Sequence, residues 1–307
     1  MKIAFMFSGQ GAQFPGMMRE LYDAEPAAKA VFDAADRALK RGVSTLCFEG
    51  TQEELNLTHN TQPCVLAADL AAAAALRTHG VEPEGAAGFS LGEYAALAWA
   101  GSIPMDDVFE IIQYRADSMQ QAVAPGAGAM AAMLGATAEQ VEAFCAEVTE
   151  GYVVAANYNC PTQTVISGEA AAVDEAVALA RKQRIRGVKL PVSAPFHCRM
   201  MEPAARALEA LFAKKRFAAP AFPVYMNVDG AVNRDPDAIP GLLVRQAMCP
   251  VRWTQTLLNM REDGFDTFIE CGPGKTLSGL AAKTLEGVTI LRVGDAQSLE
   301  ETLNTLA

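Results

Sequence analysis

Residues 86–97 read Ala-Ala-Gly-Phe-Ser-Leu-Gly-Glu-Tyr-Ala-Ala-Leu, and we expect the rest of the chain to be arranged around them. A small-residue run leads into a Gly-x-Ser-x-Gly pattern, which an alanine-rich helical segment follows. A tight strand-to-helix turn leaves little space near its backbone, so Gly88 and Gly92 suit the positions on either side of Ser90. Such a turn exposes the serine hydroxyl at a helix N-terminus, where N–H groups stabilise developing negative charge. Ser90 is therefore the candidate nucleophile, although the same pattern also occurs by chance in glycine-rich loops.

The segments around this turn predict a mostly parallel sheet. A strand over residues 85–89 precedes Ser90, and a helix runs from the turn to Trp99. At the N-terminus, residues 2–7 form a short apolar strand that leads into the polar loop 8–13. Other strands are predicted over residues 224–228 and 267–271. Short apolar strands that alternate with helices indicate a parallel sheet covered on both faces.

The predicted helices follow from apolar periodicity and from their start and stop signals. One helical pattern covers residues 18–39, and after turn signals at 56–63 another covers 63–80, with Pro63 in its first turn. A helix that begins after Ser102 carries Arg115 on an otherwise apolar face. Later helices end near Lys215 and begin at residues 250–253.

Residues 125–190 differ from the rest of the chain in the order of their elements. The pattern there is strand (129–134), helix (137–149), strand (152–157), strand (164–168), helix (170–183) and strand (186–190). This order is that of a ferredoxin-like unit. We therefore predict an α/β protein with a large α/β-hydrolase-like subdomain, residues 1–124 and 191–307, and an inserted ferredoxin-like small subdomain, residues 125–190.

Composition excludes several classes of function. The chain has 307 residues, 51% of them hydrophobic, and a net charge of −11, which disfavours general nucleic-acid binding. No run of about 18 uncharged apolar residues predicts a membrane span, and the short apolar N-terminus does not match a signal peptide, so we expect a cytoplasmic protein. The seven cysteines form no Cys-x-x-Cys pair and predict reduced thiols rather than a metal site. Loop 8–13 lacks the lysine of a nucleotide-binding P-loop.

A serine nucleophile needs a base within hydrogen-bond reach, which histidine supplies best. His59 lies in a polar turn and His79 at a helix end, whereas His197 lies on a loop after Pro195 and Phe196. His197 is therefore the candidate base. No acidic residue is marked by a motif as its partner, so a backbone carbonyl is the expected orienting group. Arg115 has two interpretations: a ligand-binding cation, or a side chain whose stem packs on the core while its head reaches water.

Seven motifs, in the same order along nearly the whole chain, resemble the malonyl-CoA:acyl carrier protein transacylases of fatty acid synthesis. They are Gly9-Gln10-Gly11-Ala12-Gln13, the turn from Gly88 to Leu97, Gln113-Tyr114-Arg115, Asn157-Tyr158-Asn159-Cys160-Pro161, Ser193-Ala194-Pro195-Phe196-His197, Pro250-Val251-Arg252-Trp253 and Gly272-Pro273-Gly274-Lys275-Thr276-Leu277.

The resemblance implies a role for each candidate residue. Ser90 carries the malonyl ester, His197 is the base and Arg115 pairs with the malonyl carboxylate. The backbone N–H groups of Gln10 and Leu91 form the oxyanion hole, and Gln10 also contacts the substrate. Backbone carbonyls near residues 248–250 hold the histidine. The implied partners are malonyl-CoA and acyl carrier protein, with no cofactor, and we expect a monomer.

Two residues depart from the family pattern, and two basic runs are candidate docking sites for the carrier. Phe89 precedes the nucleophile where histidine is common, and Cys198 follows His197 where a small polar residue is common, which places a potentially alkylatable thiol beside the base. Residues 181–189 and 214–216 are the densest basic runs, although such runs are usually solvated surfaces.

Three alternatives stay open on the sequence alone. The same serine and histidine suit an esterase or thioesterase, and hydrolysis without a carrier would distinguish it. A loader of substituted malonyl groups for polyketide assembly is disfavoured by the bulky Phe196 before His197. A catalytically silent scaffold that binds acyl carrier protein is disfavoured by the presence of Ser90, Arg115 and His197 together.

Overall fold

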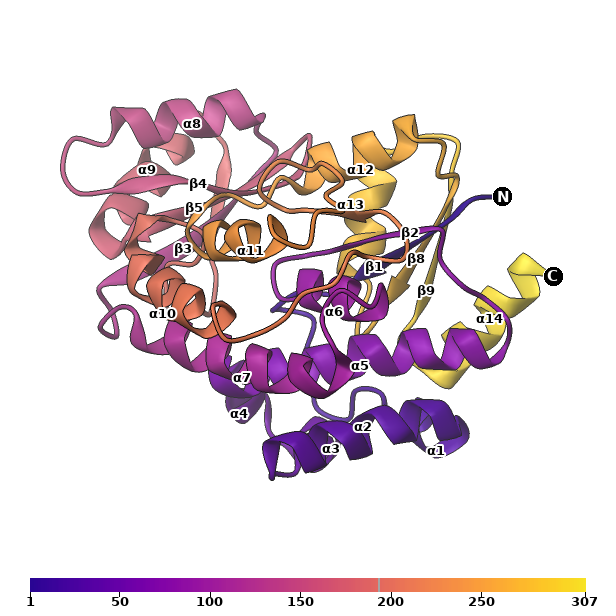
Figure 1. The fold of residues 1–307 in the computed structure, drawn as a ribbon. Coiled ribbons are helices and arrows are strands. Elements are labelled where there is room, and N and C mark those ends of the chain that lie inside the picture. Colours follow the sequence, from indigo (N-terminus) through magenta and orange to yellow (C-terminus); the bar gives the residue numbers. More distant parts are fainter. Residues whose placement is uncertain (193) are drawn as a thin grey trace.

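The computed structural model describes residues 1–192 and 194–307, and it contains two sheets (Figure 1). The large sheet has all its neighbouring strands parallel, in the order β7 (Val224–Tyr225), β2 (Gly85–Gly88), β1 (Ile3–Phe7), β8 (Thr267–Cys271) and β9 (Thr289–Val293). The small sheet is antiparallel, in the order β4 (Val153–Cys160), β5 (Gln163–Glu169), β3 (Gly128–Leu134) and β6 (Arg186–Lys189). The predicted fold class is therefore confirmed.

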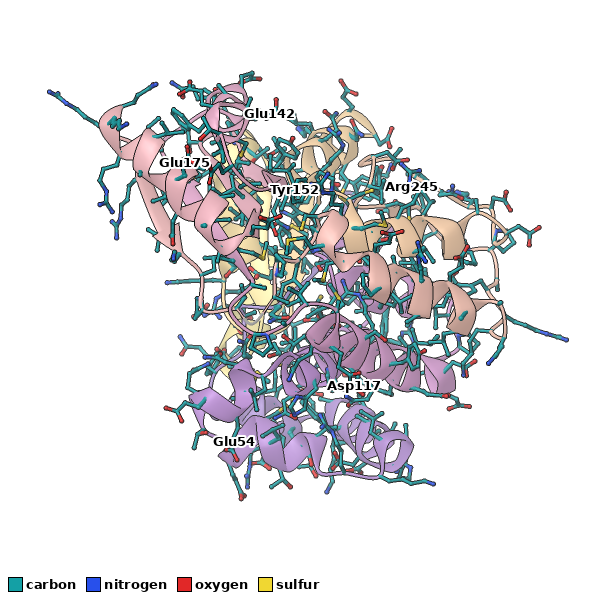
Figure 2. All side chains as sticks on the ribbon, turned by 90° about the vertical axis from the view of Figure 1, so that its left-hand side faces the viewer. Glu54, Asp117, Glu142, Tyr152, Glu175 and Arg245 are labelled. Atoms are coloured by element: carbon teal, nitrogen blue, oxygen red, sulfur yellow. The ribbon has the colours of Figure 1, made fainter. Side chains whose placement is uncertain are left out.

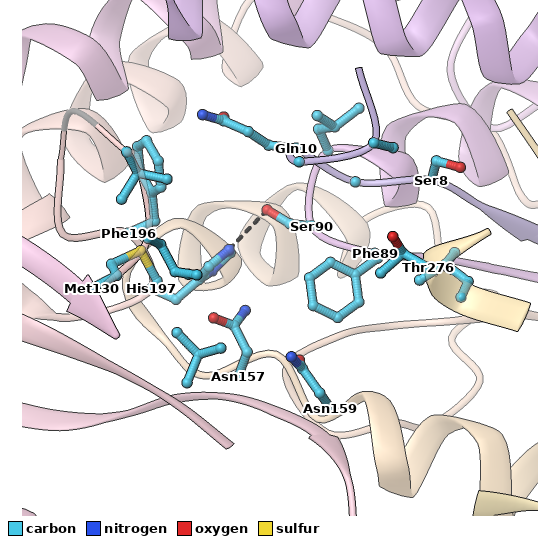
Figure 3. A pocket seen from close by; sticks show the side chains of 18 of the residues that line it. Ser8, Gln10, Phe89, Ser90, Met130, Asn157, Asn159, Phe196, His197 and Thr276 are labelled. Atoms are coloured by element: carbon cyan, nitrogen blue, oxygen red, sulfur yellow. Dashed lines mark hydrogen bonds between the residues drawn. The ribbon is translucent and has the colours of Figure 1, made fainter. Parts of the chain in front are cut away.

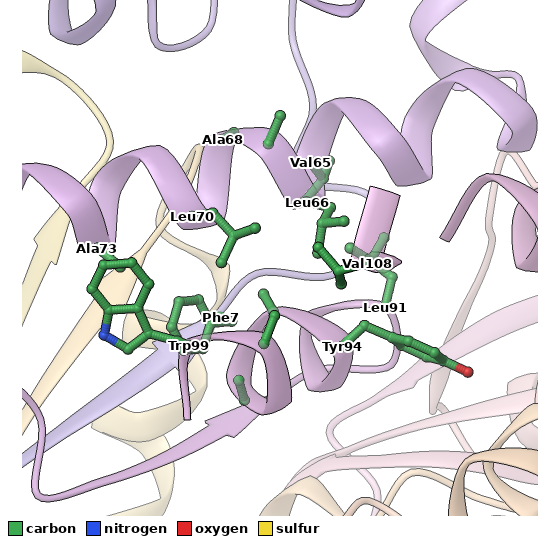
Figure 4. Close-up of a cluster of buried hydrophobic side chains, with 14 of the residues drawn as sticks. Phe7, Val65, Leu66, Ala68, Leu70, Ala73, Leu91, Tyr94, Trp99 and Val108 are labelled. Carbon is green, nitrogen blue, oxygen red and sulfur yellow. The ribbon is translucent and has the colours of Figure 1, made fainter. Parts of the chain in front are cut away.

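The central strand β1 is buried on both faces, which is why its sequence is apolar throughout. Phe5 and Phe7 pack on one side, while Ala4 and Met6 pack on the other with Trp253. The first side is covered by the helices α5 (Thr58–Thr78), α6 (Gly92–Trp99) and α7 (Met105–Gln121) (Figure 4), and also by α2 (Pro26–Leu39). The second side is covered by α12 (Trp253–Glu262) and α13 (Thr276–Thr284). Two-sided burial of this kind is typical of parallel sheets.

Strand register brings three loops to one edge of the large sheet. Phe7 is opposite both Gly88 and Cys271, so β1, β2 and β8 end at the same level. The loops that leave these strands therefore begin side by side, at the carboxyl edge where α/β proteins bind ligands.

The remaining helices complete the two covering layers, and charged side chains project from their outer surfaces (Figure 2). They are α1 (Arg19–Ala24), α3 (Val43–Glu49), α4 (Gln52–Asn56), α10 (Glu202–Phe212), α11 (Ile239–Met248) and α14 (Ala296–Leu306). No helix within the described ranges combines the length and the apolar content that crossing a bilayer requires.

The small sheet has the predicted order of elements. Its strands are joined by α8 (Ala138–Glu147), which starts with a Thr137–Gln140 capping box, and by α9 (Ala170–Lys182). Both helices pack on one face of the sheet, against Met133 and Ile166 (Figure 1). The opposite face turns towards the large sheet. The subdomain limits at residues 124/125 and 190/191 stay a prediction.

Backbone hydrogen bonds join the small sheet to the large unit. Val251, just before α12, donates its N–H to the carbonyl of Ala156 at 2.9 Å, and its own carbonyl accepts from Tyr158 N–H at 2.9 Å. Thr254 Oγ1 donates to the Tyr158 carbonyl at 3.1 Å. Strand β4 thus continues its pairing across the boundary between the two units.

One predicted helix start was wrong. Helix α5 begins at Thr58, not Pro63, so residues 58–63 are helical and His59 lies in the first turn. Pro63 cannot donate to the His59 carbonyl four residues earlier. Gln113 Nε2 and an Arg41 guanidinium nitrogen donate to that carbonyl instead, each at 3.1 Å, which accounts for a proline inside the helix.

Candidate active site

The strand, turn and helix around Ser90 lie where the motif predicts them. Strand β2 ends at Gly88, α6 begins at Gly92, and Ser90 has a left-handed backbone with φ = 54°. A Cβ at Gly88 would clash with the backbone of Gly92, and one at Gly92 with the carbonyls of Phe7 and Ser8. Both glycines are therefore required by close backbone contacts.

Ser90 and His197, 107 residues apart in the sequence, form a hydrogen-bonded pair. Ser90 Oγ lies 2.8 Å from His197 Nε2 (Figure 3), and His197 Nδ1 lies 2.8 Å from the carbonyl oxygen of Gln246. A carbonyl only accepts, so Nδ1 carries the proton and Nε2 of the neutral ring accepts from the serine hydroxyl. This is the arrangement of a nucleophile and its general base.

The surroundings of His197 keep its imidazole neutral. The side chain is buried, and its burial, together with the nearby Arg115 cation, lowers the pKa of His197 to about 4, against the smaller opposing effect of the Gln246 and Cys249 carbonyls. At neutral pH the ring is therefore ready to accept a proton. The expected carbonyl near residues 248–250 was only partly right, because the oxygen that accepts from Nδ1 at 2.8 Å belongs to Gln246.

Arg115 is buried with its guanidinium directed at the serine. One terminal nitrogen donates to Ser90 Oγ at 3.0 Å and to Gln246 Oε1 at 2.9 Å, and the other donates to Gln62 Oε1 at 2.7 Å. The side chain is 1% exposed, so its head does not reach bulk water. Burial lowers the pKa of Arg115, while Tyr94 and Glu93 oppose that shift. The structure thus favours the ligand-binding interpretation of this residue.

Gln246 connects Ser90, His197 and Arg115, and no motif marks it in the sequence. Its backbone carbonyl accepts from His197, its side-chain oxygen accepts from Arg115, and its Nε2 donates to the Ser90 carbonyl at 2.7 Å. Gln62, which holds the other guanidinium nitrogen, was also missed. Both are buried glutamines on helices, and sequence alone does not separate such residues from surface ones.

A cavity of about 190 Å³ lies between the two sheets and contains this site. Figure 3 shows Gln10 on one side of Ser90 and Asn157 and Asn159 on the other. The lining also includes Leu91 and Phe196. Neither Gln10 N–H nor Leu91 N–H donates a hydrogen bond to another residue of the described ranges. These two N–H groups are therefore available to a ligand oxygen.

Other sequence candidates lie outside this arrangement or are inert within it. His59 contacts Gln120, and His79 lies 3.0 Å from a carboxylate oxygen of Glu25. Cys198 donates to the Pro195 carbonyl, and burial raises the pKa of its thiol, which does not fit reactivity towards alkylating agents. Ser193, part of one family motif, lies outside the described residues.

Phe89 forms part of the cavity wall. Its ring packs edge-on against Trp253, with centroids 5.5 Å apart, and it lies so close to Gly9 that a Cβ there would be 2.8 Å from the ring. Gly9 is needed for this close approach of the first loop. The apolar residue before the nucleophile is thus accommodated by its neighbours.

Comparisons with known proteins agree with this geometry. A family model described as an acyl transferase domain matches residues 4–299. Malonyl CoA-acyl carrier protein transacylase of Bacillus subtilis is 42% identical over 308 residues, which cover 99% of this chain and 97% of the relative. The protein of the same name from Escherichia coli K12 is 38% identical, with 98% and 99% covered.

Solved structures show the same likeness. The acyl-carrier-protein S-malonyltransferase of Burkholderia pseudomallei has a TM-score of 0.96 and 41% identity, covering 99% of this chain and all of that one. A malonyl-transacylase in complex with its type II PKS acyl-carrier protein has a TM-score of 0.96 and 37% identity, covering 99% and 100%.

Proposed function

Because this chain belongs to the malonyl-CoA:acyl carrier protein transacylase family of acyl transferases, we propose that it moves malonyl groups from malonyl-CoA to the phosphopantetheine thiol of acyl carrier protein. One observation carries the proposal. Ser90 Oγ lies 2.8 Å from the base His197 and 3.0 Å from the buried cation Arg115. The nucleophile is thus activated beside a group that recognises a carboxylate.

The first half-reaction forms an ester on Ser90. His197 Nε2 takes the hydroxyl proton as Oγ bonds to the thioester carbonyl carbon. The N–H groups of Gln10 and Leu91 stabilise the negative oxygen of the tetrahedral intermediate. The carbon–sulfur bond then breaks, and coenzyme A leaves as a thiol with the proton from His197.

The second half-reaction runs the same steps in reverse with another thiol. His197 deprotonates the phosphopantetheine thiol, its sulfur attacks the ester carbonyl, and Ser90 Oγ leaves with the returned proton. The neutral state that the low pKa of His197 maintains suits both directions. The mechanism is therefore ping-pong, with one site serving donor and acceptor.

Arg115 selects the acyl group. The guanidinium is buried against the neutral oxygens of Gln62 and Gln246, which fix its orientation but do not neutralise its charge. A malonyl carboxylate forms charge-assisted hydrogen bonds with this group, and an acetyl group has no atom that does so. Burial strengthens the discrimination because water does not screen the pair.

The scheme calls for no cofactor, since its nucleophile, base and oxyanion donors are all groups of the chain. We expect the protein to be a monomer. Sedimentation at several protein concentrations measures that state.

Intact-protein and peptide mass spectrometry after incubation with malonyl-CoA tests the proposal. We expect a malonyl adduct on Ser90 that disappears when holo acyl carrier protein is added, with malonyl appearing on the carrier. Ser90→Ala serves as the control and should remain unmodified. Absence of the adduct in the wild-type protein would overturn the scheme, and release of free malonate without carrier would instead identify a hydrolase.

A further inference from the structure

Asn227 holds the turn that carries Ser90, although it lies 137 residues away in the sequence. It follows β7 and is fully buried. Its Oδ1 accepts from Ser90 N–H at 2.7 Å, and its Nδ2 donates to the Gly88 carbonyl at 2.7 Å. One amide thus bonds to backbone groups on both sides of Phe89.

The backbone of Asn227 is held in place by hydrogen bonds at both its N–H and its carbonyl. Its N–H donates to Glu93 Oε2 at 2.6 Å, and its carbonyl accepts from Arg252 N–H at 2.9 Å. Glu93 lies in the first turn of α6, directly after the turn, and Arg252 precedes α12. The amide is therefore positioned from both layers that cover the large sheet.

These contacts matter because the turn is strained and its backbone groups are buried. A left-handed backbone is unfavourable for serine and persists only when its surroundings require it. Buried N–H and C=O groups also need partners. A primary amide supplies one acceptor and one donor at the required spacing, which a carboxylate or a hydroxyl does not.

We propose that Asn227 is a positioning residue for acyl transfer, which sets the direction of Ser90 Oγ and determines which N–H groups face the substrate. This inference rests on the proposed function. Ser90 N–H is committed to Asn227, so it does not serve the oxyanion. Leu91 N–H, the next along the chain, remains for that role with Gln10 N–H.

Two variants separate positioning from folding. In Asn227→Ala the turn loses both bonds, and we expect kcat per active site to fall about 10²-fold with KM changed less than about threefold, as for a misplaced nucleophile. The matched control is Asn259→Ala. Asn259 also donates from Nδ2 to a backbone carbonyl, that of Gly230 at 2.8 Å, but it does not line the cavity.

Asn227→Asp keeps the size and shape of the side chain, and we expect its loss of kcat to depend on pH. A protonated carboxyl still donates to the Gly88 carbonyl, whereas a carboxylate repels it. The Glu93 carboxyl accepts from the backbone N–H of residue 227, and Asp229 and Arg115 are the charged groups that act on Glu93. We expect kcat near that of the wild type in acid and a loss of about tenfold or more in mild alkali, because burial and like charge favour the neutral acid.

Active sites are counted by the fraction of Ser90 that takes up malonyl at long times, and thermal unfolding follows the fold. A lower Tm with unchanged kcat per active site would reduce Asn227 to a structural role and overturn the inference. So would a ratio of Asn227→Asp to wild-type kcat that does not vary with pH, even if Asn227→Ala fails to fold. Wild-type protein that takes up no malonyl on Ser90 would refute the proposed function, a separate result.

Discussion

Arg115 donates to the side-chain oxygen of Gln246 at 2.9 Å, and no carboxylate in the described ranges forms an ion pair with it. The site therefore contains a buried positive charge whose hydrogen-bond acceptors, on Gln62, Ser90 and Gln246, are neutral. Such a charge is costly unless a ligand neutralises it, so its place beside Ser90 points to an anionic acyl group.

Replacing Arg115 should change the choice of acyl group. We expect Arg115→Ala to lower kcat/KM for malonyl transfer about 10²-fold, equivalent to about 3 kcal/mol for a charged hydrogen-bonded contact, with a smaller effect on acetyl transfer. Arg115→Lys retains the charge but not the planar guanidinium, so its kcat/KM for malonyl transfer should lie between those of the wild type and Arg115→Ala. Parallel assays with malonyl-CoA and acetyl-CoA measure this, and equal losses for both donors would contradict the assigned role.

The acid limb of the pH profile for Ser90 acylation should lie well below the ordinary pKa range of histidine. Burial lowers the pKa of His197 to about 4, so the ring stays neutral and able to accept a proton as the pH falls through 6 and 5. We expect kcat/KM for Ser90 acylation to decline only as the pH approaches that value. Rapid-quench acylation across this range measures the limb, and a midpoint near 6.5 would show that the ring is not held neutral.

Glu93 should make stability depend on pH in the opposite direction to His197. Burial raises the pKa of Glu93 to about 8 from 4.5, so between these values the folded protein binds more protons than the unfolded chain and the stability contributed by this group is lost as the pH rises. His197, whose pKa is lowered, contributes stability that is lost as the pH falls from 6.5 towards 4.

Glu93→Gln isolates the first effect. Relative to wild type, this variant should gain up to about 1.4 kcal/mol in free energy of unfolding for each pH unit between 4.5 and 8. Urea unfolding at several pH values measures the difference. Glu300→Gln, at an exposed position on α14, is the matched control. A constant difference between Glu93→Gln and wild type across this range would contradict the prediction.

The basic run that ends α9 and enters β6 is the better candidate for carrier docking. Strand β6 continues into Leu190 and Val192, which line the cavity. In the other run, Lys215 already forms ion pairs with Asp107 and Glu110, each at 2.7 Å. We expect Arg184→Glu combined with Arg186→Glu to slow transfer to the carrier about tenfold at low salt, less at high salt.

Acylation of Ser90 by malonyl-CoA should be much less affected by that double variant. Lys214→Glu with Arg216→Glu is the control of equal charge change. Time-quenched assays at two salt concentrations measure the rate of Ser90 acylation and the rate of malonyl transfer to the carrier separately. An unaltered transfer rate, or a stronger effect of the control pair, would place the docking surface elsewhere.

Much of the fold follows from local signals, and the prediction of α5 failed where contacts distant in the sequence decide the outcome. The strand–helix order of residues 128–189 and the turn at Ser90 depend on short periodic stretches bounded by glycine. Helix α5 was started too late because Pro63 normally begins a helix, and its tolerance inside one depends on Gln113 and Arg41, far away in sequence. Helices α3, α4, α11, α13 and α14 and strand β9 were left unassigned.

The candidate site was also predicted only where motifs mark its residues. Ser90, His197 and Arg115 were identified because motifs mark them, and the structure brings them together. Gln246 and Asn227 were missed because their roles exist only in three dimensions: each bonds to groups more than 45 residues away, namely His197 for the first and Ser90 for the second. Amide side chains carry no charge or reactivity that would single them out in a sequence.

The backbone bonds between Val251 and strand β4 have a consequence for traffic through the site. Ala156 and Tyr158 bond to Val251 on the side of the cavity formed by Asn157 and Asn159. The two halves of the protein cannot swing apart there without breaking those bonds. The site therefore has a fixed seam along this wall, and any widening of the cavity that keeps these bonds has to occur on another side.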